Sequence, residues 1–162
     1  MLALIVSMAV LCCMLSVSPW EVQASAKGWI QVDGSYLTTQ DTSTGYSPEA
    51  VTKGEHLMEG RCTITKAGRN RIYVYASTTA NHYVDYVAVD IYVDQYNEET
   101  GEWEQIDAWY VEDTDTYFVA TSKTITVERG YYYRVHAEHF AGDEEDYPYD
   151  ETTSFTDGIL IP

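Results

Sequence analysis

Residues 83–95 read Tyr-Val-Asp-Tyr-Val-Ala-Val-Asp-Ile-Tyr-Val-Asp-Gln, the clearest alternation of apolar and polar side chains in the chain. Successive side chains of a β-strand point to opposite faces, so this stretch predicts a strand with two unlike sides. One side is apolar and consists of Val87, Val89, Ile91 and Val93. The other carries Tyr86, Ala88, Asp90, Tyr92, Asp94 and Tyr96. We expect the valines to face a core and the tyrosines and carboxylates to face outward.

Similar alternation recurs every dozen or so residues, between clusters of Gly, Asn, Asp and Ser. The other strands that this pattern predicts cover 27–32, 56–66, 70–78, 103–112, 117–127, 131–138 and 155–161, and a Thr/Ser/Gly-rich loop over 35–48 has room for one more. No amphipathic helix or helical crossover separates them, which excludes a parallel α/β fold. The predicted fold class is all-β: an antiparallel β-sandwich of about eight strands, immunoglobulin- or fibronectin-like or jelly-roll-like, after an N-terminal signal helix.

The first residues are typical of a secretory signal. Residues 2–17 are almost wholly apolar, Pro19 follows, and small residues stand at the positions a signal peptidase requires. We expect a signal peptide over 1–26, cleaved after Ala24 or Ala26, then a single all-β domain over 27–162 and a secreted, extracellular location. An uncleaved membrane anchor is the alternative, although the apolar run is slightly short for one.

The net charge and the cysteine content indicate which partners the protein can bind and whether it can form a disulfide. The formal net charge is −17, which repels nucleic acid and anionic lipid, so we expect no nucleic-acid partner and no membrane partner after cleavage. Cleavage would remove Cys12 and Cys13 and leave Cys62 without a disulfide partner. Because Cys62 lies in a predicted strand, we interpret it as an inert core residue rather than a reactive thiol.

Three segments carry a resemblance to a known family. They are Gly-Arg-Cys-Thr-Ile-Thr-Lys-Ala-Gly at 60–68, Ala-Ser-Thr-Thr-Ala at 76–80, and Gly-Tyr-Tyr-Tyr-Arg-Val-His at 130–136 with His139. Their order resembles a group of small secreted β-sandwich proteins of Gram-positive bacteria, classed as a domain of unknown function. The resemblance covers about residues 28–162. It implies a secreted all-β protein and supplies no catalytic residues.

Candidate catalytic and metal-binding residues are few. His136 and His139 are three residues apart in a predicted strand, so they should point to opposite faces and not share a zinc ion. No Gly-x-Ser-x-Gly motif is present, and we expect no enzyme activity. The acidic loop over 143–151 is either a solvated loop or a Ca²⁺ site, with Asp143, Glu144 and Asp146 as its candidate ligands. No other cofactor is expected.

The candidate binding surface is the tyrosine side of residues 83–95. We expect Tyr86, Asp90, Tyr92 and Asp94 to bind a ligand, together with Trp103 and Trp109 from the next strand. Cross-strand tyrosines also stabilise sheets without binding anything, which is the competing interpretation.

The position of the two tryptophans depends on strand register. Pairing Tyr96 with Glu102 turns both tryptophans toward the core and sets Asp107 opposite Ile91. A slip or bulge of one residue exposes both tryptophans and buries Ile106, Ala108 and Tyr110 instead.

The function that these observations favour is a secreted, non-catalytic binding module for an extracellular glycan or a cell-surface protein. A structural or matrix-type extracellular protein is the alternative, and a small secreted hydrolase ranks third. Exposed tryptophans beside the tyrosines would favour binding, a flat uncovered edge strand would favour assembly, and a deep pocket with converging carboxylates would favour hydrolysis.

Overall fold

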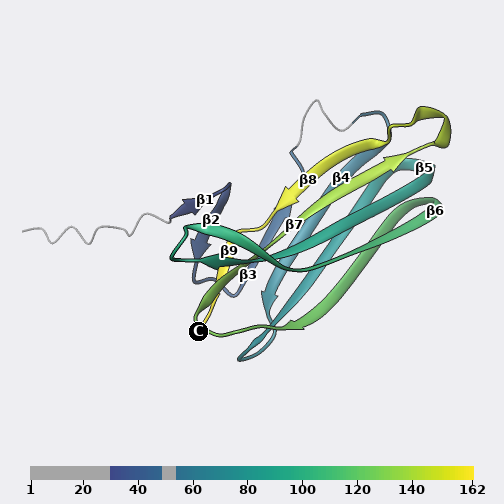
Figure 1. Cartoon of the computed structure of the whole chain (residues 1–162). Helices are drawn as coiled ribbons and strands as arrows, with labels where there is room; N and C mark the ends of the chain where they lie inside the picture. Colours follow the sequence, from purple (N-terminus) through teal and green to yellow (C-terminus); the bar gives the residue numbers. More distant parts are fainter. Residues whose placement is uncertain (1–29, 49–53) are drawn as a thin grey trace, which may run out of the picture.

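The computed structural model describes residues 30–48 and 54–162, and most of these residues lie in β-strands (Figure 1). The expected all-β fold is confirmed, whereas the expected signal peptide and signal helix lie outside the described residues. Within those residues the one helical element is a single 3₁₀ turn, η1 (Glu144–Asp146). The strands are β1 (Gln31–Val32), β2 (Ser35–Thr38), β3 (Thr42–Tyr46), β4 (Leu57–Lys66), β5 (Arg71–Asn97), β6 (Glu102–Thr126), β7 (Tyr131–Gly142), β8 (Asp150–Phe155) and β9 (Gly158–Ile161).

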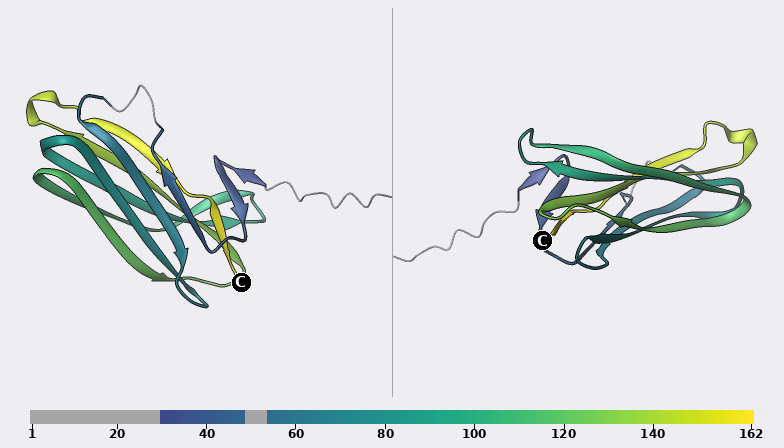
Figure 2. Two further views of the ribbon diagram at one scale, coloured as in Figure 1. Left: turned by 180° about the vertical axis from the view of Figure 1, so that it is seen from behind. Right: turned by 60° about the horizontal axis from the view of Figure 1, so that its bottom comes forward.

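All nine described strands belong to one sheet that curls into a half-barrel (Figures 1 and 2). The order is β1-β2-β9-β7-β5-β4-β3, with β6 paired to β5 and β8 paired to β7. Every described pair is antiparallel except β2 with β9, which run parallel with Leu37 opposite Gly158. The expected antiparallel β-sandwich of about eight strands is therefore not confirmed, because the described strands form one mixed sheet of nine strands. Parallel pairing is possible here because β2 and β9 are far apart in the sequence and no hairpin joins them.

β5 and β6 each join two strands that the sequence pattern separates. β5 continues through 79–82, and β6 runs with it along both halves. The pairing register shifts between Thr79 and Val84, and on β6 the bend falls beside Asp115, whose φ of 52° is left-handed. Neither a glycine nor a proline interrupts this stretch, so the ladder bends instead of ending. The first half of β5 pairs with β4 and the second half with β7.

The bend turns the apolar side of β5 inward, and this side forms the centre of the core. Val87, Val89, Ile91 and Val93 are completely buried, which confirms the predicted valine face. Apolar residues of β4, β7 and β9 complete the core, among them Cys62, Ile64, Val135, Ala137, Ile159 and Ile161. The Cys62 thiol donates a hydrogen bond to the carbonyl of Val135 at 3.7 Å, so β4 and β7 meet across the interior.

The hairpin between β5 and β6 sends the two tryptophans to opposite faces. Asn97 pairs with Glu102 and Tyr96 with Trp103, and a bulge beside Asp94 then shifts the register. Trp103 therefore shares the tyrosine side, while Trp109 sits opposite Ile91 and packs against the core. Neither of the two expected registers is right, because the bulge falls between the tryptophans and not before both of them.

The same register places the residues near the bulge. Asp107 lies opposite Val93. It forms an ion pair at 2.6 Å with Lys123, which belongs to the other half of β6, beyond the bend. The Lys123 ammonium lies 4.9 Å from the centre of the Trp109 ring. Ile106 and Tyr110 are exposed, contrary to the alternative that would bury them. A carboxylate on the inner side is tolerated because a cation of the same strand meets it.

His136 and His139 lie on opposite faces of β7, as predicted. His139 is completely buried, and its ring nitrogens lie 2.8 Å from the hydroxyls of Thr78 and Ser154. A Cβ at Gly60 would fall 2.3 Å from the His139 ring, so glycine is required for this contact. Burial lowers the pKa of His139 to about 4.

We predict that this histidine makes the fold sensitive to mild acid. The unfolded chain takes up a proton near the usual histidine pKa of 6.5, whereas folded His139 takes one up only near 4. Its contribution to stability is complete above pH 6.5 and decreases by about 3 kcal/mol as pH falls to 4. Urea unfolding of wild type and His139→Gln at pH 7 and pH 4 measures this. The variant should lose less stability between the two pH values, and an equal loss would contradict the assignment.

Cys62 is the inert core residue that the sequence indicates. Its side chain is completely buried and burial raises the pKa of its thiol to about 11, so almost no thiolate exists at neutral pH. We predict that a thiol reagent added to the folded protein leaves Cys62 unmodified for hours and labels it at once in denaturant. Rapid labelling under native conditions would show that the interior opens readily.

Candidate functional site

Two of the expected ligand-binding residues are engaged within the protein. The buried Arg134 donates from Nε to Asp94 at 2.9 Å and from Nη2 to Asp33 at 2.9 Å. Its guanidinium lies 4.6 Å from the centre of the Trp103 ring. Burial alone would raise the pKa of Asp94, but hydrogen bonds to His136 and Arg134 outweigh it and hold that pKa below its usual range. Asp94 and Trp103 therefore hold Arg134 in place.

Removal of Arg134 should destabilise the fold strongly. We predict that Arg134→Met leaves the buried Asp94 carboxylate without its main cation and lowers the free energy of unfolding by about 3–5 kcal/mol. The matched control Asp33→Asn removes the exposed partner of the same arginine and should change it by less than about 1 kcal/mol. Chemical denaturation measures both. Similar effects of the two variants would show that burial does not distinguish the two ion pairs.

The remaining tyrosines lie on a continuous outer surface of β5, β6, β7 and β8. We call this surface the aromatic–acidic face, and it consists of Tyr86, Asp90, Tyr92, Tyr110, Glu112, His136, Glu138, Phe140 and Phe155. The Tyr92 ring stacks on His136 with centroids 4.7 Å apart, and His136 stacks on Phe155 at 5.5 Å. These three residues are cross-strand neighbours, so the row of rings crosses three strands.

Carboxylates alternate with these rings. The Tyr86 hydroxyl donates to Glu112 at 3.1 Å, and the Tyr92 hydroxyl donates to Glu138 at 3.3 Å. Burial is the main cause that raises the pKa of Tyr86 to about 12, and the neighbouring Glu112 carboxylate adds to it. The same two causes raise the pKa of Asp90. In the part of the chain that the structure describes, no ion pair involves Asp90, Glu112 or Glu138. The face is therefore rich in acceptors and lacks a neutralising cation at these three positions.

One end of the face is hollowed into a pocket of about 310 Å³. We call it the aromatic pocket, and it is lined by Tyr86, Asp90, Phe140, Tyr147, Pro148, Tyr149 and Glu151. Tyr86 and Tyr149 stack with centroids 4.6 Å apart, and Tyr147 meets Tyr149 edge-on at 5.6 Å. A Cβ at Gly142 would fall 2.8 Å from the Tyr149 ring, so this glycine lets the loop lie against β7.

The structure thus separates the six expected binding residues into three groups. Tyr86, Asp90 and Tyr92 lie together on the aromatic–acidic face. Asp94 and Trp103 belong to the Arg134 cluster, and Trp109 lies on the inner side with its Nε1 donating to Thr121 at 3.3 Å. The wall formed by Tyr147 and Tyr149 was not expected, because alternation along one strand says nothing about a loop that folds over it.

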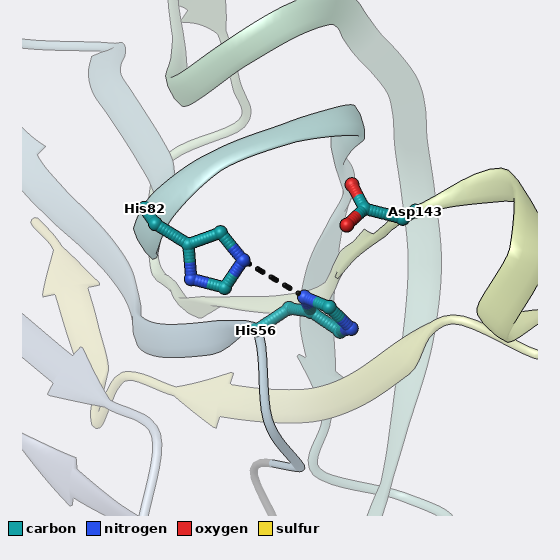
Figure 3. Close-up of side chains that lie close together, drawn as sticks. All are labelled: His56, His82 and Asp143. Carbon is teal, nitrogen blue, oxygen red and sulfur yellow. Dashed lines mark hydrogen bonds between the residues drawn. The ribbon is translucent and has the colours of Figure 1, made fainter.

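The acidic loop contacts a histidine through one of its three expected calcium ligands. Asp146 lies 3.1 Å from Nε2 of His56, and Glu144 is exposed in η1. Among residues 30–48 and 54–162, one group of three potential metal ligands has its ligand atoms within 4.8 Å of one another, and it consists of His56, His82 and Asp143 (Figure 3). Of the three expected calcium ligands only Asp143 belongs to this group. The two histidines were missed because they are 26 residues apart and belong to no motif.

No family model matches the chain, and no curated protein matches it. The resemblance to small secreted β-sandwich proteins therefore stays a prediction. Within the described ranges, no helix has the length and apolar character needed to cross a membrane.

Proposed function

We propose that this protein is a secreted, non-catalytic binding domain whose aromatic–acidic face and aromatic pocket bind a neutral or cationic extracellular glycan. The observation that carries the proposal is the aromatic pocket itself. Four aromatic rings and two carboxylates converge there, and none of the lining side chains is cationic. Secretion rests on the apolar segment and small-residue cleavage sites of residues 1–26.

The chemistry of the pocket suits a sugar ring. A pyranose offers an apolar C–H surface and a rim of hydroxyl donors. Tyrosine rings can stack on the C–H surface because they are flat and apolar. Carboxylate and phenolic oxygens can bind the hydroxyl groups because they accept hydrogen bonds. A pocket with mostly apolar walls and a few polar groups is the usual form of a small-ligand site. Asp90 and Glu151 would supply those polar groups here.

Charge restricts which glycans fit. The chain carries a formal net charge of −17, and Asp90, Glu112 and Glu138 add carboxylates at the binding face itself. Sulfated or uronic-acid polymers would be repelled, as would nucleic acid. Neutral polysaccharides, and those with free amino groups, are not repelled. The concave pocket favours a sugar over a flat protein surface.

A structural, self-assembling role is the second candidate, and one observation favours it. β6 spans Glu102–Thr126 and pairs only with β5 among the described strands, so one of its edges is free along its length. Exposed edges pair readily with other chains. The edge is nevertheless protected by the bulge beside Asp94 and by carboxylates at Glu104, Asp113 and Asp115. We therefore rank assembly below ligand binding.

A glycan panel tests the proposal. We expect the protein to be retained by neutral or amino-bearing polysaccharides such as xylan or chitosan, and not by hyaluronan. Tyr86→Ala and Tyr149→Ala should each weaken binding about tenfold or more, because each removes one ring of a stacked pair in the pocket. Isothermal titration with the best oligosaccharide measures the affinities.

The matched control is Tyr73→Ala, which removes an exposed strand tyrosine from the other half of β5, away from the pocket. It should bind as wild type does. If no neutral or amino-bearing glycan is retained, or if both pocket variants bind as tightly as the control, the proposed function is wrong.

A further inference from the structure

The end of the domain where β5 bends holds a compact group of metal-ligating side chains that is separate from the aromatic pocket. Nδ1 of His56 lies 3.2 Å from Nε2 of His82, and one ligand atom from each of His56, His82 and Asp143 lies within 4.8 Å of the others (Figure 3). His56 precedes β4, His82 lies at the bend of β5, and Asp143 follows β7. Three segments far apart in the sequence therefore present one ligand atom each to a common point.

Backbone contacts fix the side chains in this arrangement. The His56 amide donates to the Asp150 carboxylate at 2.6 Å, and the His56 carbonyl accepts from the Asn81 amide at 2.8 Å. Asp143 accepts from the Asp85 amide at 2.9 Å. His56 is buried, whereas His82 is exposed, so the group has one closed side and one side open to solvent. Hydrogen bonds thus anchor the backbone of His56 and the carboxylate of Asp143 before any ion binds, while His82 is held by its ring contact with His56.

We infer that His56, His82 and Asp143 form a binding site for a divalent transition-metal ion, with Zn²⁺ as the ion that fits best. Zn²⁺ takes imidazole nitrogens at about 2.0–2.1 Å in tetrahedral geometry, which sets two such nitrogens about 3.3 Å apart. The observed 3.2 Å between the histidine nitrogens matches this spacing. Calcium and magnesium prefer oxygen ligands only, so two imidazoles disfavour them.

A second, independent contact supports the assignment. Asp146 in η1 places a carboxylate oxygen 3.1 Å from Nε2 of His56, the nitrogen that points away from the group. A hydrogen bond from Nε2 to this carboxylate leaves the lone pair of Nδ1 facing His82. Metal-bound histidines almost always make this contact from their other nitrogen, which fixes the tautomer and raises the basicity of the ligating atom. Three protein ligands also leave a fourth position open to water.

A metal ion here would join the start of β4, the bend of β5 and the loop after β7. That loop continues from η1 directly into Tyr147 and Tyr149, which form one wall of the aromatic pocket. A bound ion would therefore restrain the loop that carries that wall. Metal binding itself does not depend on the proposed glycan function, and the two are tested separately.

The test is a titration of the EDTA-treated protein with Zn²⁺, followed by calorimetry and thermal melting. We expect one ion per chain and a rise in melting temperature, because the ion binds only the folded arrangement. Neither millimolar Ca²⁺ nor millimolar Mg²⁺ should reproduce the rise. X-ray absorption of the zinc complex should show nitrogen and oxygen neighbours and no sulfur, since Cys62 lies in the core.

Variants locate the site. His82→Ala should abolish the rise in melting temperature, and Asp146→Asn should weaken zinc binding about 10–100-fold by removing the contact to His56. The control Glu145→Gln removes a neighbouring exposed carboxylate and should bind zinc as wild type does. Because the His82 side chain is exposed, its variant is expected to fold, and circular dichroism verifies this.

Three results would overturn the inference: no zinc binding to wild type, equal zinc binding by His82→Ala, or a preference for Ca²⁺ over Zn²⁺. The last would favour an all-carboxylate site in the acidic loop instead. Zinc titration without glycan tests the metal site, and glycan retention by Tyr86→Ala tests the pocket with all three metal ligands unchanged, so either proposal can fail without the other.

Discussion

The pairing of β5 with β6 through a single bend is the constraint on which the rest of the structure depends. An antiparallel ladder of this length cannot stay flat, because strands twist and a register shift concentrates the bend at one place. Between Thr79 and Val84 the ladder turns, and the apolar sides of its two halves face each other. β4 pairs with the first half of β5 and β7 pairs with the second half, so a single sheet encloses its own core as a half-barrel.

The outer surface follows from the same bend. Once the valines of β5 face inward, the tyrosines of that strand must face outward beside β6 and β7, because side chains alternate strictly. The cross-strand register then sets His136 against Tyr92 and Glu138 beside it. Carboxylates therefore flank aromatic rings on one face of the sheet, and the proposed ligand binding rests on that face.

The bend also brings together side chains that are far apart in the sequence. It brings His82 to the end of the molecule where β4 begins and β7 ends, and there it meets His56 and Asp143. The loop that carries Asp143 and Asp146 then folds back over Tyr86 and forms a wall of the aromatic pocket. The candidate metal site and the candidate ligand pocket are therefore neighbours because they share one loop.

Alternation alone determined the all-β fold, the inward valines, the outward Tyr86 and Tyr92, the opposite directions of His136 and His139, and the burial of Cys62. These properties are local, since the period of two assigns each side chain to a face of its own strand. Only the tertiary structure decided that four predicted strands merge into β5 and β6, that a bulge sends Trp103 and Trp109 to opposite faces, that Asp94 holds Arg134, and that His56 meets His82. Such features depend on register, bending and loop placement between distant segments, and the free energy that selects them comes from packing across the whole sheet rather than from any one stretch of residues.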